Sequence, residues 1–515
     1  MNFLLGLWAS ATAAHGFSAT NLVTITREQR RLVQDNPFTD ILQSVGDSIS
    51  SAAQDLVGSV TESAAKALLG DRVVDSFDLP PPATAEINKQ VVACVVALVA
   101  FILVAYVVDM IFPSRKGSTR PSYTCMATLL GSYALLLPGL VSNLFEFLLG
   151  VELLGAKVLL TQENGDPAPI SESSFGLLHL LWQTGGYAGA VLVLIYAMAI
   201  PAVKLIALIL AEIWRDSEDP MKVQRSKRFI QVVQIVSKWA CPDMFAYIML
   251  LYLFRHLDGA GGIVAAPARL GIGFACFSMF CVCSTFSTLM IQVPEVDESL
   301  EDDVTRPFLV RWVGEDNLQL ATAALTVAFL TFFSLGMTLP VMVLYLDSNL
   351  LIKPRGPLDP AMKPFIDTLH IEDLVNSEVT IFSATRALAN YIGAGELNDV
   401  FAVVMLTVFV MALPIANMFC LLGAAWQMRY KASNLDAANR FLGASKVIKH
   451  IAMLDVFLMG IIVVTAAGSA YSEQGVLFGV LVGLWILLVA EVLHYFTHYQ
   501  VHEACKWLEK STMEK

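Results

Sequence analysis

The sequence predicts an all-α, polytopic helical membrane protein of about nine transmembrane helices, organised as two parallel four-helix repeats plus an extra N-terminal span. Hydrophobic residues make up 56% of the chain and charged residues 15%, against roughly 25% charged residues in a soluble domain. Apolar runs of about 20 residues recur along the sequence. A proline-to-aspartate stretch occurs twice, which indicates an internal duplication.

The duplicated stretch joins the end of one apolar run to the start of the next. Its first copy contains Pro201-Ala-Val-Lys204 and, after a charged connector, Trp239-Ala-Cys-Pro-Asp243-Met-Phe245. Its second copy contains Pro414-Ile-Ala-Asn417 and Ile451-Ala-Met-Leu-Asp455-Val-Phe457. The proline-to-aspartate distance differs by one residue between the copies. Such a match in a chain without low complexity favours duplication over chance.

The N-terminal region is predicted to lie outside the membrane. Residues 1–16 resemble a signal peptide, with a short apolar core followed by small residues, although the basic start is missing; an uncleaved amphipathic N-terminus is the alternative. Residues 17–87 are predicted to form an exoplasmic amphipathic helical segment that ends in a stiff proline linker. Its apolar stripe favours a helix that docks on this protein over one that captures lipid or a partner.

The spans are predicted from apolar runs, and their orientation from Lys and Arg. The first span, within residues 88–113, precedes two sets of four, and the apolar runs lie near 91–112, 124–148, 187–213, 241–257, 269–292, 318–346, 398–426, 451–469 and 475–498. Connectors 113–122, 214–240 and 427–450 are basic and fall on one side, which predicts an exoplasmic N-terminal segment and a cytosolic tail at 499–515. Which membrane the protein occupies is left open.

The two sets of four share an internal plan, which we expect to define repeats at 123–292 and 318–498. Each set has a Leu-Pro pair, at Pro138 and Pro340, and then an exoplasmic segment that begins at Phe175 or Phe382. The proline span, the connector, the Asp-x-Phe span and a closing span follow. Both copies start and end on the same side, so we expect parallel repeats with a pathway at or near their interface.

These motifs resemble the paraquat-inducible protein A family, including its lipid-transport relatives of the LetA type. The resemblance rests on Pro-x-x-Lys (Pro201, Lys204), Trp-x-x-x-Asp-x-Phe and the exoplasmic Ile381-Phe-Ser383, and covers about residues 123–498. It implies an inner-membrane component of lipid transport that works with an exoplasmic mammalian-cell-entry (MCE) protein. The chain departs from the family in lacking C-x-x-C zinc ribbons, in its N-terminal additions, and in having Asn417 where the first copy has Lys204.

The polar residues inside the spans are the candidate substrate or coupling network. A lysine at the depth of Lys204 is costly unless it snorkels or pairs, so Asp243, Glu212 or a connector acid is its expected partner. Asp455 lies near Lys449 and His450, and Asn417, Thr407 and Thr465 could complete a second cluster. The alternatives are that Lys204 reaches the headgroups, that Asp243 caps a helix, and that the other groups only hydrogen-bond between helices.

The sequence predicts no catalytic site, no cofactor and no metal site. It contains neither a P-loop nor G-x-S-x-G, so we expect a protein that is not an enzyme. Glu491, His494, His498 and His502 share one helical face and are only weak metal candidates, since no thiolate pair supports them and an interfacial tail explains them. A net charge of −12 argues against nucleic acid.

Two classes of function follow. The first is an integral membrane component of lipid or amphiphile transport between membranes, whose partners are membrane lipids and an exoplasmic MCE-type or other lipid-carrier protein. It predicts a lateral or outward apolar cavity with Lys204 and Asp243 beneath it. The second is a membrane scaffold or assembly factor that moves no substrate, and a gradient-driven small-solute transporter is a further alternative.

Overall fold

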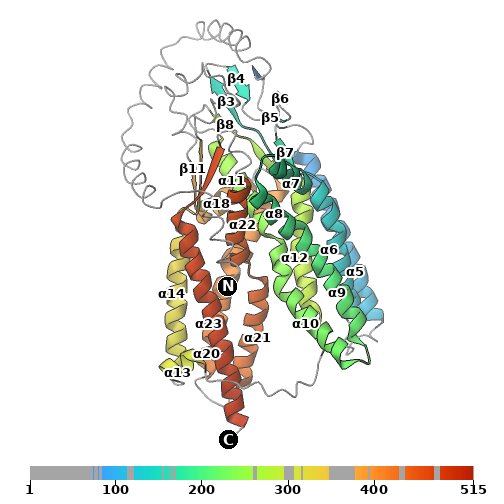
Figure 1. Ribbon diagram of the computed structural model, residues 1–515, viewed down its shortest axis with the longest axis vertical. Helices are drawn as coiled ribbons and strands as arrows, with labels where there is room; N and C mark the ends of the chain where they lie inside the picture. The colour runs from blue at the N-terminus through green and yellow to red at the C-terminus, as the bar shows by residue number, and fades with distance from the viewer. Residues whose placement is uncertain are drawn as a thin grey trace.

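A computed structural model of the chain shows a tall helical bundle with short strands at one end (Figure 1). The structure describes residues 73–74, 79, 84–112, 121–153, 156–159, 162–163, 166–167, 170–258, 264–294, 307–314, 317–346, 377–392, 395–428, 435–468 and 476–513. The predicted signal peptide and amphipathic helix lie outside these residues. We call the two ends of the bundle the strand end and the tail end, because the C-terminal helix projects from the latter.

The fold is that of a multi-pass, all-α membrane protein, as the sequence predicts. Eight helices in the described residues are long and apolar enough to cross a membrane: Thr84–Ile111, Tyr123–Val141, Tyr187–Arg215, Ile272–Met290, Leu318–Thr338, Leu397–Met428, Asp436–Ala467 and Val482–Ser511. The ninth predicted span, 241–257, corresponds to α11 (Pro242–Leu257), which at 16 residues is too short to cross alone.

The duplication is visible element by element. The first repeat consists of α6 (Tyr123–Val141), β2 (Phe145–Phe147), β7 (Ile170–Glu172), α7 (Ser174–Gln183), α8 (Tyr187–Val193), η3 (Leu194–Ala199), α9 (Ile200–Arg215), α10 (Pro220–Val236), η4 (Ser237–Ala240), α11, β9 (Ala268–Leu270) and α12 (Ile272–Met290). The second consists of α14 (Leu318–Thr338), β10 (Met342–Leu346), β11 (Ser377–Val379), α18 (Ile381–Ile392), α19 (Leu397–Val404), η7 (Met405–Ala412), α20 (Leu413–Met428), α21 (Leu435–Ile451), α22 (Leu454–Ala467), β12 (Val476–Val480) and α23 (Val482–Met513). Both repeats carry a π-helical segment, η3 or η7, at the same place.

Small antiparallel sheets at the strand end fix how the repeats align. The order β7-β2-β9 in the first repeat matches β11-β10-β12 in the second. Phe145 of β2 lies opposite Leu270, and Met342 of β10 lies opposite Val480. Counting onward from these pairs makes Ser284 of α12 equivalent to His494 of α23.

The first repeat also carries an insertion of strands between β2 and β7. Two strands, β3 (Gly150–Leu153) and β4 (Ala156–Leu159), pair with β8 (Val264–Ala265) and β1 (Val73–Val74), and β5 (Gln162–Glu163) pairs with β6 (Asp166–Pro167). None of these sheets is predicted from the sequence. Their strands are mostly two to five residues long, too short to show the alternation by which a strand is recognised.

Two of the three basic connectors of the sequence prediction, 214–240 and 427–450, are mostly helical over their described residues. In the first repeat, α10 turns back antiparallel to α9, so that Ser226 donates to the Ala211 carbonyl and Phe229 stacks on Trp214. Ser237 thereby reaches Lys204, which lies eleven residues, or about 16 Å, above Arg215 at the end of α9. The span is broken at η4, and Asp243 begins the part that follows, α11.

The Leu-Pro pairs occupy different places in the two repeats. Gly139 and Gly336 are equivalent. A Cβ at either would lie within about 3 Å of the closing helix of its repeat, at Phe277 of α12 or Leu487 of α23. Pro138 precedes Gly139 inside α6, whereas Pro340 lies beyond the end of α14. The structure therefore gives a different alignment, in which the close-packed glycines correspond.

The core lies where the two repeats meet. Helices α11 and α22 are almost fully buried and pack on each other. The equivalent residues Phe245 and Phe457 meet edge to face, with ring centroids 5.6 Å apart. Helices that are apolar on nearly every face are stable only when they are buried inside such a bundle.

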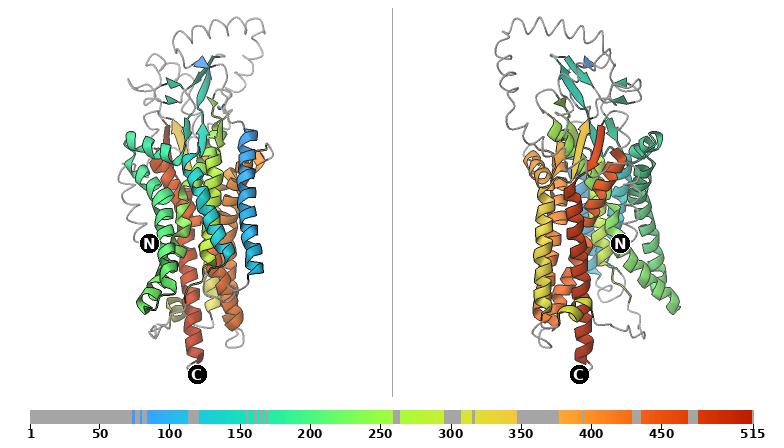
Figure 2. Two further views of the ribbon diagram at one scale, coloured as in Figure 1. Left: turned by 90° about the vertical axis from the view of Figure 1, so that its right-hand side faces the viewer. Right: turned by 60° about the vertical axis from the view of Figure 1, so that its left-hand side comes forward.

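The extra span α5 (Thr84–Ile111) lies on the flank of the first repeat (Figure 2). It packs against α6 and α12, and most of its surface is exposed apolar side chains, as expected of a helix in lipid. A short helix, α13 (Phe308–Val313), leads into the second repeat.

The packing of α5 can be tested through two cysteines. The sulfur atoms of Cys94 on α5 and Cys276 on α12 lie 3.9 Å apart. We expect a membrane-permeable thiol oxidant to link them, since small side-chain motions bring the sulfurs to bonding distance. Peptide mapping by mass spectrometry should find the linked pair, and Cys94→Ser should lose it. Cys420 serves as an internal control and should stay unlinked. If Cys94 and Cys276 fail to link in a sample whose Cys420 can be alkylated, that result would contradict this packing.

Candidate functional site

The first repeat buries a lysine cluster between α9, η4 and α12. Lys204 is 2% exposed, and its Nζ donates to Ser237 Oγ at 2.5 Å and to the Ser284 carbonyl at 2.8 Å. Ser237 Oγ lies 3.3 Å from Thr285 Oγ1. No carboxylate in the described part of the chain is within ion-pair distance of Lys204, and Glu212 pairs with Arg215 instead. Lys204 thus neither reaches the headgroups nor has the expected acidic partner.

Asp243 is buried near this cluster. It is 2% exposed and begins α11, with the backbone N–H groups of its own residue and of Met244 facing the carboxylate. Neither carboxylate oxygen meets hydrogen-bond geometry with a described group. Cys281 of α12 is within electrostatic reach of both Asp243 and Lys204, so the two ionisable groups face one small region without forming an ion pair.

The second repeat buries a histidine cluster at the equivalent place. Asn417 lies where the first repeat has Lys204, and its side chain contacts His494 at 2.7 Å and Ser445 at 2.5 Å. Glu491 and His498 of α23 continue the cluster, Glu491 through His494 and His498 through Ser445 of α21. The sequence reasoning had placed Asn417 in one cluster and the histidines in another, because α20 and α23 are distant along the chain.

Thr407 and Thr465 lie apart from the histidine cluster. Thr407 is exposed on η7, and Thr465 donates to the Ile461 carbonyl of its own helix. Pro201 and Pro414 each follow a π-helical segment, where their missing N–H is accommodated. In the first repeat, Tyr133 Oη of α6 also donates to the Pro201 carbonyl at 2.9 Å.

A buried ion pair joins the two repeats. Lys238 of η4 lies 2.9 Å from Asp455 at the start of α22, and both side chains are less than 10% exposed. Tyr495 Oη donates to the same carboxylate at 2.7 Å, and Lys238 also donates to the Ala452 carbonyl. Lys449 covers the Tyr495 ring at 4.2 Å. Sequence reasoning singled out Asp455 but left Lys238 among the basic connector residues, because the break at η4 was not visible in the hydropathy.

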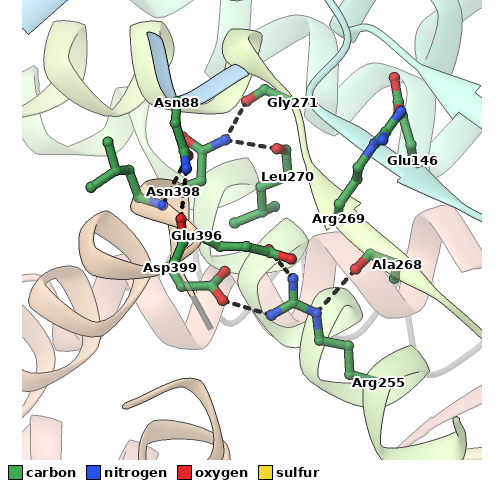
Figure 3. A network of polar contacts seen from close by, with 12 residues as sticks. Asn88, Glu146, Arg255, Ala268, Arg269, Leu270, Gly271, Glu396, Asn398 and Asp399 are labelled. Atoms are coloured by element: carbon green, nitrogen blue, oxygen red, sulfur yellow. Dashed lines mark hydrogen bonds and ion pairs between the residues drawn. The ribbon is translucent and has the colours of Figure 1, made fainter. Parts of the chain in front are cut away.

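A second inter-repeat contact, the arginine clasp, lies near the strand end (Figure 3). Arg255 of α11 binds Asp399 Oδ2 at 2.6 Å and also pairs with Glu396, while its Nε donates to the Ala268 carbonyl at 3.0 Å. The guanidinium lies over the Tyr391 ring. No residue of the clasp was predicted as a site, because single charges near helix ends are common on solvated surfaces.

The arginine clasp also holds α5 and the first sheet. Asn398 donates to the Leu270 and Gly271 carbonyls, and Asn88 of α5 both donates to the Gly395 carbonyl and accepts from the Leu397 N–H. Figure 3 shows the adjoining ion pair between Arg269 and Glu146 across β9 and β2.

The clasp has no counterpart on the opposite side of the repeat interface. Counting from the equivalent residues Phe245 and Phe457, Ala467 of α22 is equivalent to Arg255. Gly189 of α8 approaches Ala467 so closely that a Cβ at Gly189 would lie 2.9 Å from Ala467 Cα. One side of the interface is therefore held by charge and the other by close backbone packing.

An apolar groove lies between α7 and α8, near the strand end of the first repeat. Its volume is about 280 Å³, and it is open on one side. The groove is lined by Phe175, Leu178, His179 and Trp182 of α7 and by Ala190, Val191 and Leu194 of the following helix.

The model of the family described as paraquat-inducible protein A matches residues 168–296 and 370–508. These two segments cover more than half of the chain, and each holds the proline span, the broken span and the closing helix of one repeat. The chain belongs to the paraquat-inducible protein A family. No curated protein and no solved structure matches it.

Within this PqiA-family chain, the matched segments contain Lys204, Asp243, Asn417 and Asp455, whereas α5 and α6 lie outside them. The described residues hold no group of three or more His, Cys, Asp or Glu arranged for a metal ion, the three histidines of α23 included. The clusters offer buried ionisable groups and hydrogen bonds.

The two buried lysines should respond oppositely to the same substitution. We expect Lys238→Met to destabilise the PqiA-family fold by about 3–5 kcal/mol, because it leaves Asp455 buried without its charge partner. Lys204→Met should change stability by less than about 1 kcal/mol or raise it, since an ammonium without a counter-ion is replaced by an apolar chain of similar length. Unfolding in mixed micelles measures both. Equal losses would show that Lys204 has a charge partner in the folded protein.

Proposed function

We propose that this PqiA-family protein is an integral membrane component of lipid or amphiphile transport. In this proposal the groove between α7 and α8 takes a lipid from the bilayer, and the exoplasmic strand end passes it to an MCE-type or other lipid-carrier protein. The observation that carries the proposal is the position of this apolar groove above the buried lysine cluster.

The groove suits part of a lipid. Its volume of about 280 Å³ is near the lower end of small-molecule sites, which run from roughly 300 to 1,000 Å³, and fits an acyl chain rather than a whole lipid. Trp182 and Tyr187 at its rim are 61% and 57% exposed and meet edge to face. Such aromatic residues favour the membrane–water interface, which would bring a headgroup beside His179 and Gln183.

The groove and the lysine cluster share one continuous helix. Lys204 lies ten residues, or about 15 Å, below Leu194. The π-helical segment η3 and Pro201 lie between them, at the type of position where helices deform. A change at the lysine cluster would therefore reach the wall of the groove through this helix.

A photoreactive side chain tests whether the groove holds lipid. We place benzoylphenylalanine at Val191 in the groove and, as the matched control, at Ile206, which is exposed on α9 below it. In detergent from which bulk lipid has been removed, we expect lipid adducts at position 191 and several-fold fewer at 206. Leu194→Trp should fill the groove and abolish the adducts at 191. Equal labelling at both positions, or none, would instead favour the scaffold.

The buried ionisable groups should matter for movement of lipid rather than its capture. We expect Lys204→Met and Asp243→Asn to slow lipid transfer between vesicles about tenfold or more, while native mass spectrometry still detects lipid bound to each variant. Ile206→Ala serves as the control of unchanged transfer. Full transfer by both variants would remove these residues from the mechanism.

A further inference from the structure

The histidine cluster forms a hydrogen-bonded chain across three helices. Glu491 Oε2 lies 3.2 Å from His494 Nδ1, and His494 Nε2 lies 2.7 Å from Asn417 Nδ2. Ser445 Oγ lies 2.5 Å from Asn417 Oδ1 and 3.2 Å from His498 Nδ1. All five side chains are less than 10% exposed. The chain therefore ties α23, α20 and α21 together inside the bundle.

The hydrogen bonds of this chain run in one direction. The amide nitrogen of Asn417 only donates, so His494 Nε2 accepts and the ring carries its hydrogen on Nδ1, facing the Glu491 carboxylate. Asn417 Oδ1 only accepts, so Ser445 Oγ donates its hydrogen to that oxygen and accepts one from His498 Nδ1. The His494 ring is thereby the neutral Nδ1–H tautomer, and the His498 ring carries a hydrogen on Nδ1.

The groups around His494 include several charges. On α23 itself these are Glu491, Tyr495 and His498, and on α21 Lys449 is within electrostatic reach of Glu491 and His498. Asp455 of α22 and Lys238 of η4 approach through Tyr495. On α20 and α14 the facing groups are neutral, Asn417 and the Phe329 ring.

We propose that His494 is a proton-binding site that reverses the direction of this chain when it is occupied. A hydronium ion gives up a proton to Nε2, so an O–H bond breaks, an N–H bond forms and a water molecule leaves. The pair of His494 and Glu491 thereby changes from a charge of −1 to neutral. Protonated Nε2 is a donor and cannot face the Asn417 amide nitrogen. The Asn417 amide rotates to present its oxygen, and its nitrogen then donates to Ser445, whose hydroxyl must turn away.

The first repeat lacks this site. Equivalent to Glu491, His494 and His498 it has Cys281, Ser284 and Thr288, and its fixed Lys204 occupies the place of Asn417. Among these equivalent positions, only those of the second repeat can respond to protonation in this way, and the response changes how α20 and α21 are held against α23. The role of this step in transport rests on the proposed function, in which it supplies the coupling ion.

Nitrogen-15 histidine NMR of the full chain in lipid nanodiscs tests the site directly, since the chemical shifts of Nδ1 and Nε2 identify each tautomer. The chain has eight histidines, and loss of signals in His494→Gln assigns those of His494. We expect the Nδ1–H tautomer at alkaline pH and a doubly protonated ring within about pH 5 to 9. An Nε2–H tautomer, or a ring that stays neutral over that range, overturns the proposal.

Two substitutions of Asn417 should move the titration in opposite directions. Asn417→Asp offers Nε2 an acceptor and should raise the midpoint by at least about one pH unit. Asn417→Leu offers none and should lower it. His256→Gln, exposed near the end of α11, should leave it unchanged. A common direction for both Asn417 variants would mean a structural role only and would overturn the proposal.

A vesicle assay separates this proposal from the proposed function. With a pH gradient imposed, we expect lipid transfer by the unmodified chain to change several-fold, and transfer by His494→Gln to lose that response. Equal responses by the two proteins overturn the coupling role and leave lipid transport standing. If neither protein transfers lipid, the proposed function fails, and the NMR titration still decides whether His494 binds the proton.

Discussion

The burial of the Lys238 and Asp455 pair is the constraint on which the arrangement of the repeats depends. A charge inside a lipid-embedded bundle is costly without a partner, and each of these residues comes from a different repeat. The break at η4 brings Lys238 to this depth, and the start of α22 brings Asp455. The broken spans, the packing of α11 on α22 and the contact between the two repeats therefore all serve to bury this ion pair.

The two repeats have diverged in what they bury. The lysine cluster has one amine held by a hydroxyl and a carbonyl, whereas the histidine cluster has imidazoles, an amide and one carboxylate. At the strand end the arginine clasp holds one side of the interface, and close packing of Gly189 on Ala467 holds the other. The clasp therefore has an uncharged counterpart, so the interface lacks the symmetry of its backbone.

Much of the fold follows from the sequence because hydropathy and repetition report spans directly. The duplication, the proline helices and the depth of Lys204 could be read from apolar runs and spacing. The break at η4 could not, since α10 is amphipathic and looks like a basic connector. The sheets were missed because their strands are short, and the Leu-Pro pairs misaligned the repeats where packing against Phe277 and Leu487 required glycine.

The site was less accessible to sequence reasoning than the fold. Asn417 and His494 are in contact but lie 77 residues apart in sequence, and Lys238 and Asp455 are farther apart still. Such pairs are defined by how helices pack, which composition does not show. The sequence indicated which polar residues are buried but not which of them meet.

The π-helical segments have a geometric consequence. Each holds more residues per turn than the α-helix around it, so a change of η3 to α-helical winding would shift the helix below it by one residue. One residue corresponds to a rotation of about 100° about the helix axis. Lys204 would then leave Ser237 and Ser284 and point toward a different neighbour, with no helix unfolded. The helix that lines the groove is therefore built so that its two halves can turn against each other.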